Sequence, residues 1–168
     1  MVTAYLGLGS NVGERISFIE NAVLEIGKIK DTVIIKSSAI YETEPWGNIK
    51  QDDYLNSVIE IETRLKAEAL LMELKNIEKR LGRIDNKRWS EREIDIDLLF
   101  YGEEIIENDL IKLPHRQIEN RRFVLIPMNE IAQCFIHPVF KKTISQLLND
   151  TKDELNVVRY HPSKIKNS

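Results

Sequence analysis

The chain has 168 residues, of which 42% are hydrophobic and 30% are charged. This balance is typical of one globular domain with a packed core, and it excludes a disordered or collagen-like chain. The net charge of -3 argues against general binding to nucleic acid or to an anionic membrane, because both are held by a strong excess of Lys and Arg.

The single cysteine, Cys134, excludes an intramolecular disulfide and a zinc site built from several cysteines, and we expect it to be a small buried apolar residue. The first residues, Met-Val-Thr-Ala-Tyr-Leu-Gly, carry neither a basic leader nor a long apolar run. We therefore expect no signal peptide, no membrane span and a cytoplasmic location. We expect residues 1–160 to form one domain that is a monomer, followed by a flexible tail at 161–168.

Short strands and amphipathic helices are predicted along the first half of the chain. Residues 3–8 form an apolar run that ends in a turn rich in glycine, and residues 14–29 then show apolar positions at helical spacing. A β-branched strand is predicted at 33–40, and residues 55–63 alternate apolar and polar side chains as in a half-exposed strand.

The second half begins with a predicted helix at 67–81, which Gly82 would end. After a polar stretch, residues 94–101 form the clearest strand, and Gly102 with the apolar pair at 105–106 predicts a hairpin. An apolar segment follows at 123–131, and the polar tail after residue 150 is expected to fray. The order β-α-β-β-α-β predicts an α+β domain in which helices cover one face of an antiparallel sheet.

Two carboxylates stand out in the strand at 94–101. Asp95 and Asp97 are two residues apart, so both leave the same face of the strand, whereas Ile94, Ile96 and Leu98 point to the other face. Oxygen ligands presented in this way suit Mg²⁺, which takes one or two carboxylates and fills its other positions with water and substrate phosphates. The same alternation is also typical of an ordinary half-exposed strand.

A basic segment before this strand favours the first interpretation. Residues 79–92 hold six Lys or Arg residues in a chain whose net charge is negative. Arginine side chains clamp phosphate oxygens, so we select Arg83, Arg88 and Arg92 as polyphosphate ligands. Trp89 lies within this polar stretch and is expected to cover a site when a loop closes, although a surface position is the alternative.

Other signals are weaker when taken alone. A single His such as His115 is more often structural than catalytic, and Arg121 and Arg122 are equally ambiguous. The glycines at 7, 9 and 13 are spaced one residue too widely for a dinucleotide-binding fingerprint, and the sequence lacks a P-loop, so we interpret them as a turn from strand to helix.

A set of short motifs, taken together and in order, resembles the family of 6-hydroxymethyl-7,8-dihydropterin pyrophosphokinases of folate biosynthesis. The longest is R-W-x-x-R-x-I-D-I-D-L-L-F-Y-G at 88–102. The others are A-Y-L-G-L-G-S-N at 4–11, Y-E-T-x-P at 41–45, Y-L-N at 54–56, L-G-R at 81–83, L-P-H at 113–115 and R-x-F-V-L-I-P at 121–127.

The resemblance implies a ferredoxin-like α+β fold and transfer of diphosphate from ATP to the hydroxymethyl group of the pterin, with AMP as the other product. It implies two Mg²⁺ ions on Asp95 and Asp97. The ATP ligands would be Arg83, Arg88, Trp89, Arg92, His115 and Arg121, of which Arg83 and Arg92 would be catalytic together with Asp97. The pterin ligands would be Thr43, Tyr54, Asn56 and Phe123, where Phe123 offers an aromatic face and Asn56 an amide that both donates and accepts.

The chain departs from the family pattern at Leu110 and Lys112, where some members carry Arg and Thr, and at Arg116, which replaces an aromatic residue or proline. These departures affect the expected adenine and phosphate contacts. Two other classes of function stay open: a magnesium-dependent nucleotidyltransferase, which also uses paired carboxylates, and a ferredoxin-like RNA-binding module, which would need aromatic residues on the sheet face.

Overall fold

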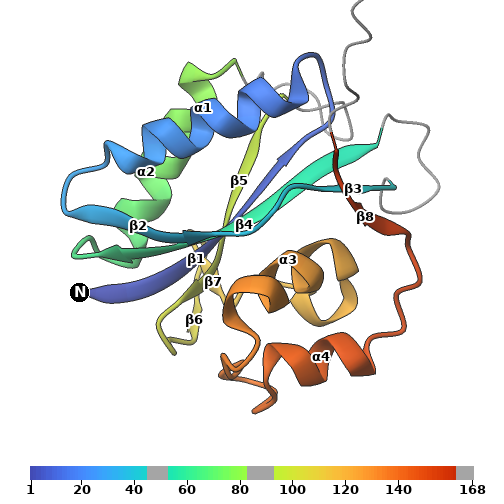
Figure 1. The fold of residues 1–168 in the computed structure, drawn as a ribbon. Helices are drawn as coiled ribbons and strands as arrows, with labels where there is room; N and C mark the ends of the chain where they lie inside the picture. Colours follow the sequence, from blue (N-terminus) through green and yellow to red (C-terminus); the bar gives the residue numbers. More distant parts are fainter. Residues whose placement is uncertain (45–52, 83–92, 162–168) are drawn as a thin grey trace, which may run out of the picture.

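The computed structural model describes residues 1–44, 53–82 and 93–161. Its main sheet contains the predicted order β-α-β-β-α-β (Figure 1). The elements in that order are β1 (Val2–Ser10), α1 (Arg15–Gly27), β2 (Thr32–Ser37), β4 (Tyr54–Thr63), α2 (Ala67–Arg80) and β5 (Asp95–Tyr101), with a short β3 (Tyr41–Thr43) between β2 and β4. The strands lie in the order β5-β1-β4, and both β2 and β3 pair with β4 along its other edge. Every one of these pairs is antiparallel, so the chain forms a ferredoxin-like α+β fold.

The spacing of apolar residues explains the two long helices. In α1 the buried positions are Ile19, Ala22 and Ile26, and they lie three and four residues apart on the side that packs on the sheet. Helix α2 buries Leu70, Leu74 and Ile77 at the same spacing. Gly82 follows α2 with a φ of +101°, a left-handed conformation that glycine adopts without strain, so the predicted end of this helix is confirmed.

Helices cover both faces of the sheet, and the expectation that they cover one face is therefore wrong. Figure 1 shows α1 and α2 on one side and α3 (Arg122–Ala132) and α4 (Ile144–Asp150) on the other. The strands supply apolar residues to both layers: Leu6 of β1 packs under α1 and α2, whereas its neighbour Tyr5 belongs to the second core with α3 and α4. Strands that are buried on both faces carry apolar residues on both, so an alternation of apolar and polar residues no longer indicates a solvent-exposed face.

The hairpin predicted after β5 forms between other residues. The strand β6 (Ile106–Glu107) pairs with β7 (Lys112–Leu113) instead of returning along β5. At the turn, the backbone N–H of Gly102 donates to the carbonyl of Thr3, and Gly102 has a φ of +53°. After this turn the chain forms the separate β6–β7 pair, and Leu113 at the end of β7 is buried in the main core.

The polar tail is ordered over part of its length. The strand β8 (Val157–Arg159) pairs with β3, and the N–H of Tyr160 donates to the carbonyl of Ile40. The expectation that the chain frays after residue 150 is therefore wrong for this stretch, while residues 162–168 lie outside the described residues. Cys134 is exposed, which also corrects its predicted burial. Within the described ranges, the helices are all too short or too polar to cross a bilayer.

Candidate active site

The two carboxylates lie on the sheet face that carries α3 and α4. In the register of the sheet, Asp95 of β5 is opposite Gly9 of β1, and Gly9 is in turn opposite Asn56 of β4. Asp97 is opposite Gly7, two residues along the same strand. Both carboxylate residues are half-buried. The predicted geometry, in which both acids share one strand face, is confirmed by the burial of Ile94, Ile96 and Leu98 in the core on the other face.

The glycines of β1 keep the sheet open between these side chains. Gly7 and Gly9 lie inside β1, so their interpretation as part of a turn is wrong, while Gly13 does lie in the turn with a φ of +62°. A β-carbon on Gly9 would lie 3.0 Å from Oδ1 of Asn56, which is closer than normal contact. The side chain of Asn56 therefore lies across Gly9, toward the strand that carries Asp95.

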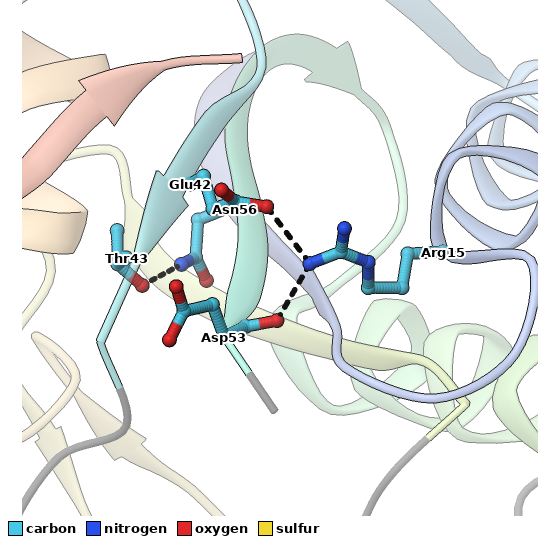
Figure 2. Close-up of polar contacts among 5 residues, drawn as sticks. All are labelled: Arg15, Glu42, Thr43, Asp53 and Asn56. Atoms are coloured by element: carbon cyan, nitrogen blue, oxygen red, sulfur yellow. Dashed lines mark hydrogen bonds and ion pairs between the residues drawn. The ribbon is translucent and has the colours of Figure 1, made fainter. Parts of the chain in front are cut away.

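Two of the predicted pterin ligands contact each other directly. Nδ2 of Asn56 donates to Oγ1 of Thr43 over 2.7 Å, and both residues are buried (Figure 2). Thr43 is paired in register with Tyr54, a third residue of this predicted set. The strands β3 and β4 thus bring together three residues that are up to 13 positions apart in the sequence.

Phe123 comes to the same side of the sheet from the first turn of α3. Helix α3 packs on β4 and on β3, and Phe123 lies at the edge of the second core. The guanidinium carbon of Arg121 lies 5.7 Å from the centre of the Phe123 ring, within the range of a cation–π contact. A predicted phosphate ligand and a predicted pterin ligand are therefore adjacent at the start of one helix.

A pocket of about 330 Å³ lies beside Asp97 at the outer edge of β5. Asp97 and His115 both line it, and the N–H of His115 donates to the carbonyl of Leu99, which holds this segment along β5. Nδ1 of His115 lies 2.9 Å from the Arg116 carbonyl oxygen. The remaining lining residues are either apolar or basic: Leu71, Lys75, Ile96, Leu98, Leu110, Ile111, Lys112 and Arg116.

Glu78 was not singled out from the sequence, although it lies against the strand that carries the carboxylates. It is 1% exposed in α2, and its Oε1 accepts a hydrogen bond from the N–H of Ile96 over 2.9 Å. The nearest cation in α2 is Lys75, whose Nζ is 3.9 Å from Oε2. The burial of Glu78 could have been predicted, because Glu78 follows Leu74 by four residues and so lies on the same buried face of the helix.

The donor set suits Mg²⁺ better than a metal that needs a full cage of protein ligands. Among the residues that the structure describes, no group of three or more His, Cys, Asp or Glu side chains gathers at one point. Two half-buried carboxylates on one strand face are, in contrast, the usual protein share of a magnesium site that opens onto substrate phosphates. The residues present therefore fit this ion.

Four of the predicted ligands lie outside the described residues: Arg83, Arg88, Trp89 and Arg92. The other eight predicted site residues are all described. Asp95, Asp97, Asn56 and Thr43 lie on one sheet face, Tyr54 is paired with Thr43, Arg121 and Phe123 begin the helix that packs on this face, and His115 lines the pocket next to Asp97.

Comparison with known proteins identifies the family. The family model described as 7,8-dihydro-6-hydroxymethylpterin-pyrophosphokinase (HPPK) matches residues 5–133. The chain belongs to this family. A pyrophosphokinase of this name from Aquifex aeolicus (strain VF5) is 42% identical over 146 residues, which cover 87% of this chain and 90% of that protein. One from Haemophilus influenzae (strain ATCC 51907 / DSM 11121 / KW20 / Rd) is 37% identical over 93% of this chain and 99% of its own length.

Solved structures of HPPK domains share the fold. A structure of HPPK-DHPS in complex with substrates matches 88% of this chain with a TM-score of 0.69 at 18% identity. A Plasmodium falciparum HPPK-DHPS variant matches the same share with a TM-score of 0.71 at 16% identity. The chain spans 43% of each of these longer chains. The HPPK membership and the ferredoxin-like α+β fold predicted from the sequence are both confirmed.

Proposed function

We propose that this pyrophosphokinase transfers diphosphate from ATP to 6-hydroxymethyl-7,8-dihydropterin on the sheet face between Asp95 and Asn56. The row Asp95, Gly9, Asn56 supports the proposal, because the proposed metal ligand Asp95 and the buried amide of Asn56 flank a residue without a side chain. Adjacent strands are about 4.8 Å apart, so the two backbones are separated by roughly 10 Å. That spacing accommodates a phosphate chain on one side and the alcohol of a pterin on the other.

Asp95 and Asp97 would hold two Mg²⁺ ions together with the phosphate oxygens of ATP. When bound, these ions neutralise charge on the phosphate oxygens and lower the pKa of a coordinated hydroxyl. Both carboxylate residues are partly exposed, which supports this role because substrate can reach them from solvent.

Asn56 and Thr43 would orient the pterin. Oγ1 of Thr43 accepts a hydrogen bond from Asn56, which leaves the hydroxyl hydrogen of Thr43 to be donated to a ring nitrogen. Oδ1 of Asn56 accepts from an amino or amide group of the pterin. Phe123 stacks on the flat ring, and Tyr54, paired with Thr43, borders the same site.

The pocket at the edge of β5 would bind the nucleotide. Its apolar side, which includes Leu71 and Leu110, suits a flat adenine, and its basic side supplies His115, Lys112 and Arg116. Lys112 and Arg116 thus take the place of the side chains that the family pattern has at these positions. Arg121 adds a cation at the start of α3, and the proposal also assigns Arg83, Arg88, Trp89 and Arg92 to ATP.

In the reaction, the hydroxyl oxygen of the pterin attacks the β-phosphorus of ATP in line. The bond between this phosphorus and the oxygen that bridges it to the α-phosphorus breaks, and AMP leaves with that oxygen. The proton of the hydroxyl passes to the carboxylate of Asp97. Catalysis depends mainly on positioning and on charge stabilisation by Asp95, Asp97 and the arginines.

Product analysis and substitution of the two acids test this proposal. Incubation with ATP, Mg²⁺ and the reduced pterin should yield AMP and a pterin diphosphate by mass spectrometry, whereas release of pyrophosphate would indicate a nucleotidyltransferase. Asp97→Ala and Asp95→Ala should each lower single-turnover rates at least about 100-fold, or about 2.7 kcal/mol in the barrier, without loss of fold. Asp150→Ala, which removes an exposed carboxylate that pairs with Lys142, is the matched control. Near-normal rates in either site variant would refute the metal assignment.

A further inference from the structure

Arg15 joins three parts of the chain behind the proposed pterin site. It is the first residue of α1, and its Nη1 donates both to Oε2 of Glu42 over 3.0 Å and to the carbonyl oxygen of Asp53 over 2.9 Å (Figure 2). Its guanidinium carbon also lies 5.9 Å from the centre of the Tyr160 ring, just after β8. The side chains of Arg15 and Glu42 are 25% and 30% exposed, so the pair is partly shielded from water.

The two partners of Arg15 are the sequence neighbours of residues in the pterin site. Glu42 precedes Thr43 in β3, and Asp53 precedes Tyr54 at the start of β4. Successive residues of a strand point to opposite faces, so Glu42 faces α1 while Thr43 faces the proposed site. Figure 2 shows this arrangement, with Arg15 on one side of the strands and the bond between Thr43 and Asn56 on the other.

This contact lies where the pairing of β3 and β4 ends. The pairing runs from Tyr41 opposite Asn56 to Thr43 opposite Tyr54. Arg15 donates hydrogen bonds to the residues that precede Thr43 and Tyr54, so it contacts both chain segments at this end of the pairing. A change in the spacing of the two strands at this end would move Thr43 relative to Asn56 and lengthen their 2.7 Å bond. An exposed ion pair would have little effect, but here one nitrogen holds the carboxylate of Glu42 in β3 and the backbone carbonyl of Asp53, the residue that precedes β4.

We propose that Arg15 is a positioning residue for the pterin: it fixes β3 against β4 so that Thr43 and Asn56 present their polar groups at the correct separation. This inference rests on the proposed pterin site. Arg15 acts through the strands and does not contact the substrate, so its loss affects pterin affinity and leaves the nucleotide pocket at the edge of β5 intact.

The test compares Arg15→Leu with Arg80→Leu. Arg80 makes an Arg–Glu pair of nearly the same length, 3.1 Å to Glu25, which joins α2 to α1 away from β3. Calorimetric titration with the reduced pterin, in the presence of a non-hydrolysable ATP analogue and Mg²⁺, should give a dissociation constant about 10-fold higher for Arg15→Leu, in line with the effect of removing groups that orient ligands in metal sites. Arg80→Leu should bind the pterin as the wild type does, and the ATP analogue should bind Arg15→Leu with unchanged affinity.

Variants of Glu42 separate positioning from general stability. Glu42→Gln keeps a hydrogen-bond acceptor and should restore near-normal pterin affinity, whereas Glu42→Leu should behave like Arg15→Leu, and the double variant should be no worse than either. If Arg15→Leu does not fold, Arg15→Lys and Glu42→Leu provide the same comparison. Unchanged pterin affinity in these variants, or an equal loss of ATP-analogue affinity, would overturn the inference. Failure of the wild type to bind the pterin would instead refute the proposed function.

Discussion

Replacing Gly9 with alanine adds one methyl group to the middle of the row that connects Asp95 with Asn56. The new β-carbon would lie 3.0 Å from Oδ1 of Asn56 and 3.8 Å from the carbonyl oxygen of Leu55. Carbon and oxygen atoms normally approach to about 3.3–3.6 Å, so the amide must move by a few tenths of an ångström. Because Asn56 is 8% exposed and bonded to Thr43, this movement strains a buried hydrogen bond.

The expected loss of stability follows from two opposing effects. Overpacking a tight site costs about 1–3 kcal/mol. Replacing glycine by alanine where the backbone allows it restricts the unfolded chain and returns about 0.4–1 kcal/mol, and Gly9 is not among the glycines with a positive φ. The midpoints of these two ranges leave a net cost of about 1.3 kcal/mol, which for a domain of this size lowers the melting temperature by roughly 3–5 °C. Pterin affinity should fall as well, since the displaced amide is the proposed pterin ligand.

A double-mutant cycle isolates the contact. The control is Gly7→Ala on the same strand face, where the β-carbon would meet the flexible end of Leu99 at 3.4 Å, an ordinary contact. Thermal unfolding should show a clearly smaller loss for Gly7→Ala than for Gly9→Ala. In an Asn56→Ala background the clash is absent, so Gly9→Ala should then cost little. If Gly9→Ala costs the same with and without the Asn56 side chain, the reasoning from this contact is wrong.

Two further predictions concern buried polar groups. Thr43→Val keeps the shape of the side chain but removes the acceptor of the Asn56 amide, so it should destabilise the fold by about 1–3 kcal/mol in urea unfolding and weaken pterin binding; unchanged values in both assays would remove Thr43 from the site. Burial lowers the pKa of His137, whose Nδ1 accepts the backbone N–H groups of Val139 and Phe140 over 3.1 and 3.3 Å. As the pH falls, His137 is protonated in the unfolded chain before it is protonated in the folded protein. The contribution of His137 to the free energy of unfolding should therefore be constant above about pH 6.5 and fall below it, by at most about 1.4 kcal/mol per pH unit. His137→Asn keeps an acceptor and should flatten this slope in urea unfolding at several pH values, whereas an unchanged slope would refute the assignment.

The secondary structure that could be predicted is the part in which local periodicity agrees with burial. The alternation around Asp95 predicted both the strand and the face of its acids, since Ile94 and Ile96 are fully buried on the other face. The tail could not be predicted in this way. Val157–Arg159 has only three residues, which is too short to signal a strand, and it forms one because the edge of β3 is available to pair with it.

Errors in the sequence interpretation share a cause in long-range packing. Helices on both sheet faces became apparent only from the second core, in which Tyr5 and Val58 of the strands meet Leu125 and Met128 of α3. The residues at 105–106 resemble the return strand of a hairpin with β5. The burial of Leu113 in the main core instead stabilises a path in which β6 pairs with β7. Local pattern cannot weigh such alternatives, because the stabilising contacts come from residues far away in the sequence.

The supporting residues of the site were missed for a related reason. Arg15 is an ordinary charged residue at the start of a helix until its contacts with Glu42 and Asp53 are known, and these lie 27 and 38 positions away. Glu78 was detectable, because a charged residue on the buried face of a predicted helix requires a partner. One of its partners is the N–H of Ile96, the residue between the two proposed metal ligands.

The glycines of β1 show how two sequence patterns could have been combined. Gly7 and Gly9 are two residues apart, as are Asp95 and Asp97, and a period of two is that of a strand face. In antiparallel pairing the two patterns lie opposite each other, glycine against acid, so that each carboxylate faces a position without a side chain. The proposed site for metal ions and phosphates needs such an open neighbour, and glycine at alternate positions provides it. The two-residue spacing of Gly7 and Gly9 therefore belongs to the sheet surface of the proposed site, and Gly13, four residues further on, belongs to the turn.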